Sequence, residues 1–134
     1  MKAPRILGII PARGGSKGLP RKNLALLCGK PLVYYVIQAA LASSRLTRTI
    51  LSSDDPEIIR VGKEYGAEAP FTRPAELATD SSSSAAVAHH TLEWIESDEG
   101  KRYDYVCLLE PTSPLRTPQD IDNAVELLLD AQAD

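Results

Sequence analysis

Short apolar runs alternate with stretches of helical periodicity along the whole chain. Continuous apolar runs, unlike alternating ones, are typical of strands that are buried on both faces of a parallel sheet. Four such runs are predicted as strands: residues 6–10, 49–52, 69–71 and 105–109. The stretches that follow repeat apolar residues every three or four positions, which predicts four helices: residues 31–44, 56–65, 85–95 and 118–128.

Residues that favour helix ends stand at the predicted helix starts. Asp55, Pro56 and Glu57 supply an N-cap, a first-turn proline and an acid that the helix dipole favours. Thr117 and Asp120 form a capping-box-like start to the last helix. The helices are predicted to be buried through these residues: Leu32, Tyr35, Val36 and Ala39; Ile58, Val61, Gly62 and Tyr65; Ala85, Ala88, Leu92 and Ile95; Ile121, Ala124, Val125 and Leu128.

The alternation of strands and helices predicts a three-layer α/β/α, Rossmann-like fold with a mainly parallel sheet and right-handed crossovers. We expect the strand order 3-2-1-4, because Pro70 lacks an N–H and restricts the third strand to an edge. This order puts the topological switch between the first and fourth strands, where open α/β sheets bind ligands. The loops 11–23 and 110–116 leave these two strands, and we expect them to face each other across one cleft.

Composition and charge narrow the function classes. A chain of 134 residues with a net charge of −3 fits one domain without general affinity for nucleic acid. No window approaches the roughly 20 apolar residues of a membrane span, and the start of the chain lacks the features of a signal peptide, so a cytoplasmic protein is predicted. Cys28 and Cys107 form no metal-ligand or CxxC pattern and are predicted to be reduced thiols.

The sharpest chemical pattern is the glycine-rich segment RGGSKGLPRKN at residues 13–23. It has neither the Walker spacing nor the GxGxxG of dinucleotide-binding folds. Its glycines let backbone amides approach phosphate oxygens, and its cations, Arg13, Lys17, Arg21 and Lys22, can neutralise a polyphosphate. A nucleoside triphosphate is the predicted ligand. The alternative is a flexible loop whose cations are only solvated, which a position directly after the first strand disfavours.

Three blocks of sequence, in order, resemble the acylneuraminate cytidylyltransferases, the CMP-sialic acid synthetases. The first is IIPARGGSKG at residues 9–18, followed by PRKN at 20–23. The second is RPAELA at residues 73–78, followed by Asp80, and the third consists of Leu108 and Leu109 with PTSPLR at residues 111–116. The likeness covers nearly the whole chain and identifies it with the N-terminal, nucleotide-binding part of that family.

The resemblance implies transfer of CMP from CTP to the anomeric hydroxyl of a nonulosonic, sialic-acid-like sugar, with release of pyrophosphate and assistance by Mg²⁺. It assigns catalytic roles to Arg13, Lys17 and Lys22. It implies this nucleotide site: Ala12, Arg13, Gly15, Ser16, Lys17, Lys22, Asn23, Arg73 and Ser84. It implies this acceptor-sugar site: Glu110, Thr112, Ser113 and Arg116. For Arg73 the alternative is a surface arginine that caps a nearby carbonyl.

Two departures from the family pattern affect these expectations. Glu110 stands where the family usually has glutamine, and an ionised glutamate only accepts hydrogen bonds and repels an acidic sugar. The acceptor therefore stays open, and Glu110 becomes a candidate Mg²⁺ ligand. Family members also continue beyond this point into a dimerisation segment and late aspartates that bind the metal. Residues 1–134 are therefore expected to form an incomplete nucleotide-binding domain with weak or absent turnover alone, whereas full-length members are homodimers.

Alternatives stay open at this point. Within the same enzyme class, the acceptor can be another keto-sugar acid of the KDO type. A second class is a noncatalytic module that binds nucleotide or works with a separate chain, and a third is a nonfunctional fragment. Among other polar residues, Asp54 and Asp55 are explained by helix capping. His89 and His90 point in different directions on one helix, so one is expected at an interface and the other exposed.

Overall fold

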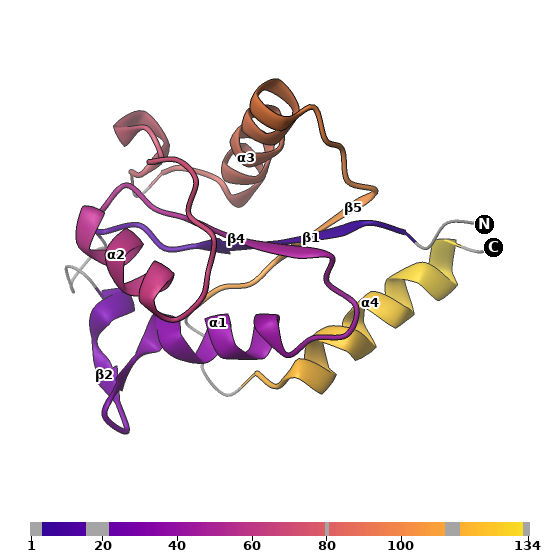
Figure 1. Cartoon of the computed structure of the whole chain (residues 1–134), viewed down its shortest axis with the longest axis horizontal. Helices are drawn as coiled ribbons and strands as arrows, with labels where there is room; N and C mark the ends of the chain where they lie inside the picture. Colours follow the sequence, from indigo (N-terminus) through magenta and orange to yellow (C-terminus); the bar gives the residue numbers. More distant parts are fainter. Residues whose placement is uncertain (1–3, 16–21, 80, 112–115, 133–134) are drawn as a thin grey trace.

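The fold is a three-stranded parallel sheet between two layers of helices (Figure 1). The computed structural model describes residues 4–15, 22–79, 81–111 and 116–132. Its sheet has the order β4-β1-β5, formed by β1 (Ile6–Pro11), β4 (Arg48–Ser52) and β5 (Tyr105–Leu108). The predicted three-layer α/β architecture is confirmed, and so are the central position of the first strand and its pairing with the second and fourth.

Four helices cover the two faces of the sheet: α1 (Leu32–Leu41), α2 (Pro56–Glu64), α3 (Ser84–Glu99) and α4 (Pro118–Gln132). Side chains of β1 alternate between the faces. Ile10 packs in one cluster with α1, α2 and α4, whereas Leu7 and Ile9 pack in the other with Ile95 of α3. The central strand is therefore buried on both faces, as a continuous apolar run predicts. No helix in the described ranges is long and apolar enough to cross a bilayer.

The predicted third strand at residues 69–71 is wrong. One parallel bridge joins Ile50 to Glu68, and the Leu51 N–H donates to the Glu68 carbonyl at 2.8 Å. In a parallel ladder the next bond back to Leu51 is donated by residue 70, and Pro70 has no N–H. The segment thus lies beside β4, on the side predicted for it, but the ladder stops after a single bridge.

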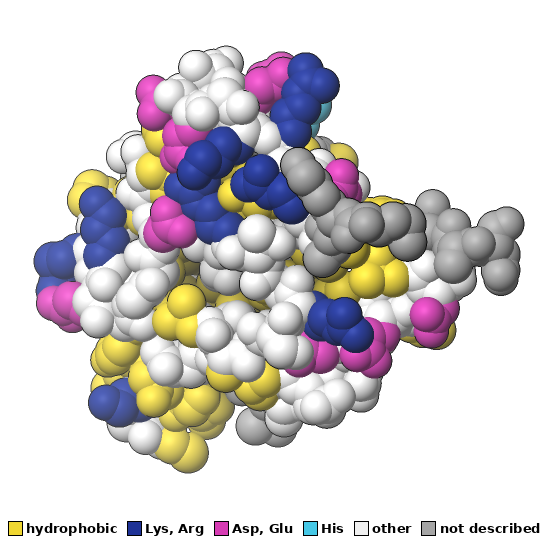
Figure 2. All heavy atoms as spheres, turned by 45° about the vertical axis from the view of Figure 1, so that its right-hand side comes forward, with side chains coloured by type: hydrophobic (Ala, Val, Ile, Leu, Met, Phe, Trp, Pro, Cys, Tyr) yellow, Lys and Arg dark blue, Asp and Glu magenta, His cyan; other side chains and the backbone are white. Residues whose placement is uncertain are grey.

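A short hairpin that periodicity did not predict precedes α1. It pairs β2 (Leu26–Leu27) with β3 (Lys30–Pro31) through a turn at Cys28 and Gly29, whose φ angles of 52° and 81° lie in the left-handed region. Leu26 is 72% exposed, and Figure 2 shows hydrophobic side chains gathered at the lower edge of the face, where this hairpin lies. Pro31 is the N-cap of α1 instead of its first residue, and the helix ends at Leu41, earlier than predicted.

The other helix starts are as predicted. The Asp55 side chain accepts from the Glu57 N–H at 2.8 Å and caps α2. At α4 the Thr117 N–H donates to Asp120 at 3.0 Å, and the Asp120 N–H donates to the Thr117 hydroxyl at 3.1 Å, which completes a capping box. The serine run caps α3 through Ser83, whose hydroxyl accepts from the Ala86 N–H.

Three of the predicted helix faces need correction. In α1 the buried residues are Val33, Val36, Ile37, Ala39 and Ala40, whereas the predicted Leu32 and Tyr35 are only half-buried. In α3 the buried residues are Val87, Thr91 and Ile95, whereas the predicted Ala85 is exposed. Thr91 is compatible with a core position because its hydroxyl donates to the Val87 carbonyl at 2.9 Å. In α4, Ile121 and Val125 are buried as predicted, but Ala124 and Leu128 are exposed.

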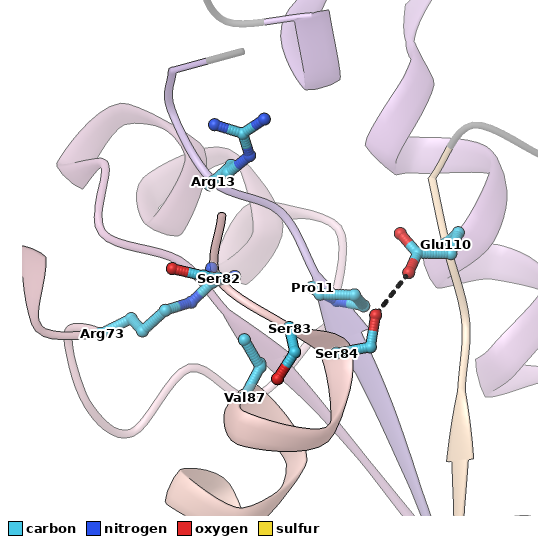
Figure 3. A pocket seen from close by; sticks show the side chains of 8 residues that line it. All are labelled: Pro11, Arg13, Arg73, Ser82, Ser83, Ser84, Val87 and Glu110. Carbon is cyan, nitrogen blue, oxygen red and sulfur yellow. Dashed lines mark hydrogen bonds between the residues drawn. The ribbon is translucent and has the colours of Figure 1, made fainter. Parts of the chain in front are cut away.

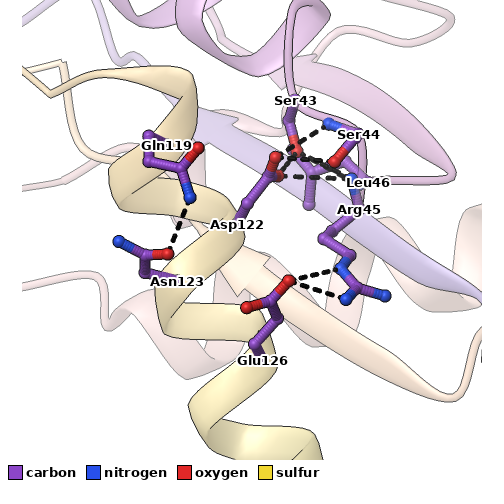
Figure 4. Close-up of polar contacts among 8 residues, drawn as sticks. All are labelled: Ser43, Ser44, Arg45, Leu46, Gln119, Asp122, Asn123 and Glu126. Atoms are coloured by element: carbon purple, nitrogen blue, oxygen red, sulfur yellow. Dashed lines mark hydrogen bonds and ion pairs between the residues drawn. The ribbon is translucent and has the colours of Figure 1, made fainter.

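Asp122 of α4 fastens this helix to the loop between α1 and β4 (Figure 4). Its carboxylate is 8% exposed and accepts from the hydroxyls of Ser43 and Ser44 and from the backbone N–H groups of Ser44 and Arg45. Arg45 also forms an ion pair with Glu126, one turn further along α4. A single carboxylate thus accepts four hydrogen bonds from this loop.

Candidate functional site

A pocket opens at the carboxyl ends of β1 and β5, beside the start of α3 (Figure 3). Its lining residues are Pro11, Arg13, Arg73, Ser82, Ser83, Ser84, Val87 and Glu110. The expected cleft is confirmed, because Pro11 ends the first strand, Arg13 lies in the loop after it, and Glu110 lies in the loop after the last strand. The pocket measures about 190 Å³, many times the roughly 10–15 Å³ that one water needs. It therefore has room for a ligand.

Arg73 forms the rigid side of this pocket. The residue is 3% exposed, and its guanidinium donates to the Ser52 hydroxyl at 3.0 Å, the Ser52 carbonyl at 2.7 Å and the Leu77 carbonyl at 3.0 Å. The pKa of Arg73 is lower than usual for an arginine, because burial and the nearby Arg13 charge lower it by more than Asp54 and Glu110 raise it. The alternative of a surface arginine is wrong, although Arg73 does bond two carbonyls. The result is a buried cation held in one orientation.

Arg13 extends over the pocket from the end of β1 (Figure 3). Its carbonyl accepts from the Asn23 side chain at 3.0 Å, so the predicted nucleotide residue Asn23 also shapes the loop that carries Arg13. Asn23 is buried in the short 3-10 helix η1 (Lys22–Leu24), and Lys22 begins this helix. The predicted site residue Gly15 is exposed. Two further predicted site residues lie outside the described residues: Ser16 and Lys17.

Ala12 is the most deeply buried of the predicted nucleotide residues. Its side chain is fully buried in the core beneath the pocket, and its N–H donates to the Ser52 carbonyl at 2.9 Å. The Ala12 side chain is therefore used by the core, and its N–H by the hydrogen bond to Ser52. Ser52 accepts hydrogen bonds from both Ala12 and Arg73, so it links the end of β1 to Arg73.

The N-terminus of α3 closes another side of the pocket with Ser82, Ser83 and Ser84. The first N–H groups of a helix have no partner within the helix, and the helix dipole favours negative or electron-rich groups there. Ser84, a predicted nucleotide residue, is exposed, and its hydroxyl donates to Glu110 at 3.5 Å. Glu110 and Ser84 lie on the side of the pocket opposite Arg73 (Figure 3).

The predicted acceptor residues do not all gather here. Glu110 lines the pocket, whereas Arg116 is not among the lining residues. Within the described part of the chain, the Arg116 Nη1 is buried without a hydrogen-bond partner. Burial raises the pKa of the Cys107 thiol above its usual value, and the positive charge of Arg116 offsets part of that rise. Thr112 and Ser113 lie outside the described residues.

Among the described residues, no three His, Cys, Asp or Glu side chains form a group that could hold a metal. Mg²⁺ is commonly bound by one or two carboxylates together with substrate phosphates, and Glu110 fits such a role as a single ligand. His89 is 73% exposed, while the His90 ring packs on Phe71 with centroids 4.9 Å apart, so one histidine is exposed and one interfacial, as predicted.

One site residue was assigned too narrowly from the sequence. The carboxylate of Asp54 accepts from the Gly14 N–H at 2.8 Å and so contacts the glycine-rich loop directly. The capping role predicted for Asp54 and Asp55 together belongs to Asp55 alone. No periodic signal marks a side-chain bond between residues 40 positions apart.

Pro11 and Arg13 of the first block and Arg73 of the second line this pocket, and comparisons with known proteins agree with the family resemblance. A family model described as cytidylyltransferase matches residues 7–134. Pseudaminic acid cytidylyltransferase from Campylobacter jejuni subsp. jejuni (serotype O:2) is 46% identical over 127 residues, which are 95% of this chain and 54% of that protein. N-acylneuraminate cytidylyltransferase from Escherichia coli O18:K1:H7 is 43% identical over 123 residues, 92% of this chain and 28% of that protein.

A solved structure shares the fold as well. The CMP:2-keto-3-deoxy-manno-octonic acid synthetase in complex with CTP superposes with a TM-score of 0.74 and 26% identity, covering 96% of this chain and 49% of the other. The chain thus spans about half the length, or less, of the relatives that it matches. With a family model that covers residues 7–134 and relatives above 40% identity, the chain belongs to the cytidylyltransferase family.

Proposed function

We propose that the pocket between Arg13, Arg73 and the start of α3 is the CTP site of an enzyme that transfers CMP to a nonulosonic acid. The observation that carries this proposal is the pair of arginines on one side of a pocket at the carboxyl ends of β1 and β5. At this edge of the sheet Arg13 can meet a triphosphate, while Arg73 offers fixed N–H donors to the base or ribose.

In the proposed reaction, the oxygen of the sugar's anomeric hydroxyl bonds to the α-phosphorus of CTP. The bond from this phosphorus to the bridging oxygen breaks, pyrophosphate leaves with the electron pair, and the hydroxyl proton is released. Negative charge grows on the leaving pyrophosphate, so fixed cations stabilise the transition state without reorganising. Arg13 supplies such a charge at the pocket, and we assign the same task to Lys17 and Lys22.

The other predicted residues take supporting roles in this proposal. Arg73 and Ser84, on different sides of the pocket, would hold cytosine and ribose. Mg²⁺, when bound with the triphosphate, would neutralise phosphate charge, and Glu110 is the described carboxylate that could contribute one ligand. A homodimer and a cytoplasmic location remain predictions; light scattering on the purified protein would check the first.

The acceptor is the least determined part of the proposal. We propose a sugar of the pseudaminic or neuraminic type, which the names of the relatives above 40% identity support. A KDO-type sugar is the second candidate, favoured by the likeness to the structure of the 2-keto-3-deoxy-manno-octonic acid synthetase. Either acceptor is an acid, so the carboxylate of Glu110 would have to be offset by cations or metal in the complete site.

Calorimetric titration with CTP, UTP, ATP and GTP, each with and without Mg²⁺, tests the proposed function. We expect CTP to bind at least about tenfold more tightly than UTP, because a site that pairs with the cytosine amino group leaves a polar group unpaired with uracil. Equal affinity for all four nucleotides would contradict a cytidylyltransferase site. Release of pyrophosphate when a sugar of either type is added would exclude the noncatalytic module.

A further inference from the structure

Asp54 extends the pairing of β1 with β4 beyond the end of the sheet. The Ala12 N–H donates to the Ser52 carbonyl, the bond that follows the last strand pair, Pro11 with Ser52. In a parallel ladder the next N–H that β1 would donate is that of Gly14, to the carbonyl of residue 54. The Gly14 N–H instead donates to the carboxylate of Asp54 at 2.8 Å. The side chain thus takes the place of a backbone carbonyl and keeps the loop aligned with β4.

One peptide group of the glycine-rich loop is held at both of its polar atoms. The Arg13 carbonyl and the Gly14 N–H belong to the same peptide plane. Asn23 donates to the carbonyl at 3.0 Å, and Asp54 accepts from the N–H at 2.8 Å. Because the carbonyl oxygen and the N–H are both hydrogen-bonded, this peptide plane cannot rotate freely. The direction in which the chain leaves Arg13 is therefore fixed as well.

The close approach of this loop to the end of β4 depends on glycine. A Cβ placed on Gly14 would lie 2.7 Å from the Oδ2 of Asp55 and 2.8 Å from its Cβ, distances that side chains do not tolerate without movement. Gly14 therefore lets the backbone come near enough for the bond to Asp54. The bond joins the loop that carries Arg13 to the loop that follows β4.

The negative charge of Asp54 disfavours binding of an anionic ligand, whereas its hydrogen bond to Gly14 favours binding by holding the loop. Burial lowers the pKa of the Arg73 guanidinium, and Asp54 lies close enough to Arg73 to offset part of that lowering. A carboxylate beside two arginines reduces the positive potential that a triphosphate would meet. If charge decides, removal of Asp54 strengthens nucleotide binding; if loop geometry decides, removal weakens it. The two effects predict opposite signs.

We propose that Asp54 is a positioning residue of the nucleotide site. By accepting the Gly14 N–H it holds the Arg13–Gly14 peptide, and through that peptide it orients the described start of the loop, residues 13–15, toward the phosphates. This inference rests on the proposed CTP site and adds to it a residue that contacts no substrate. The positioning effect is the larger one, because a loop held at one pole only would sample orientations in which its amides point away from the ligand.

Two substitutions at Asp54 separate geometry from charge. Asp54→Ala removes the acceptor, and we expect CTP to bind about tenfold more weakly. Asp54→Asn keeps an acceptor oxygen but loses the charge, and binding is expected to stay within about threefold of the parent chain, or to become tighter. Asp98→Ala, at an exposed position on α3, is the matched control and should change nothing. CTP binding by Asp54→Ala as tight as that of the parent chain, or an equal loss in both Asp54 variants, would overturn the proposal.

The Gly14 amide gives a second readout that needs no nucleotide. Hydrogen exchange followed by NMR should be at least about tenfold faster at Gly14 in Asp54→Ala than in the parent chain, and near the parent rate in Asp54→Asn. If the parent chain binds no CTP, the proposed function fails; an unchanged Gly14 exchange rate would separately overturn the role of Asp54. Should Asp54→Ala not fold, Asp54→Ser, whose side chain is one bond shorter, provides the same two measurements.

Discussion

Arg13→Ala is expected to weaken CTP binding by about tenfold to a hundredfold, the range for loss of one charge-assisted hydrogen bond of roughly 1.5–3 kcal/mol. The Arg13 side chain is half-buried and extends over the pocket opposite the carboxyl end of β5. Its backbone is held by Asn23, so truncation of the side chain leaves the loop anchored. Calorimetric titration of the parent chain and the variant measures the effect.

A matched arginine elsewhere makes this test specific. Arg102 pairs with Glu96 at 2.7 Å, and its side chain is 83% exposed beyond the end of α3. Arg102→Ala removes the same charge from the chain but should leave CTP affinity within about twofold, because exposed charges away from a site are screened by salt. An equal loss in the two variants would mean that net charge, and not the pocket, controls binding.

Asp122→Ala is expected to lower the free energy of unfolding by about 2–3 kcal/mol, the largest stability effect that we predict. The carboxylate is 8% exposed and accepts four hydrogen bonds from Ser43, Ser44 and Arg45 (Figure 4). Without it, the donors at the end of α1 lose their partner and α4 loses its attachment to this loop. Urea unfolding followed by circular dichroism measures the change.

The pH dependence of stability provides a check on the same residue. Burial alone raises the pKa of Asp122, but the bonds from Ser43, Ser44 and Arg45 together outweigh it and hold the pKa below its usual value. Because the pKa of Asp122 is lower in the folded state, its contribution to the free energy of unfolding is complete above the unfolded pKa of about 3.9. This contribution is lost as pH falls through the folded pKa. Asp122→Asn should therefore flatten the acid limb of the stability curve.

Glu126 supplies the control on the same helix. It pairs with Arg45 at 2.7 Å, but both side chains are nearly half exposed, and such surface pairs contribute about 0–1 kcal/mol. Glu126→Ala should accordingly cost much less than Asp122→Ala. If both variants unfold at the same urea concentration, Asp122 is not the attachment point of α4.

Much of the scaffold is predictable because its elements are coded locally. Continuous apolar runs marked the three strands of the sheet, and Asp55, Thr117 and Asp120 marked helix starts through contacts two or three residues away. The order of the strands followed from topology rules, and with it the place of the pocket. The prediction of a third strand was wrong because an apolar run does not show which residues must donate an N–H to the neighbouring strand. Here one of those residues is Pro70, which has no N–H.

The pairings that hold the site together are less accessible from the sequence. Asp54 with Gly14, Asp122 with Ser43 and Arg73 with Ser52 join residues 40, 79 and 21 positions apart. All three use polar residues in or beside loops, where neither apolar periodicity nor spacing carries information about partners. The family resemblance indicated Arg13, Arg73 and Ser84 for the site, and these residues line one pocket. It did not indicate which acids hold their loops in place.

The most direct test of the central claim is an NMR titration of the ¹⁵N-labelled chain with CTP and Mg²⁺. We predict shifts in the backbone amides of Arg13, Gly14, Arg73, Ser84 and Glu110, around the pocket that these residues form or adjoin. Amides beside the surface hollow at Leu92 and Tyr103, beyond the other end of the sheet, should stay unchanged. Shifts confined to that hollow, or no shifts at millimolar CTP, would contradict a CTP site at the carboxyl ends of β1 and β5.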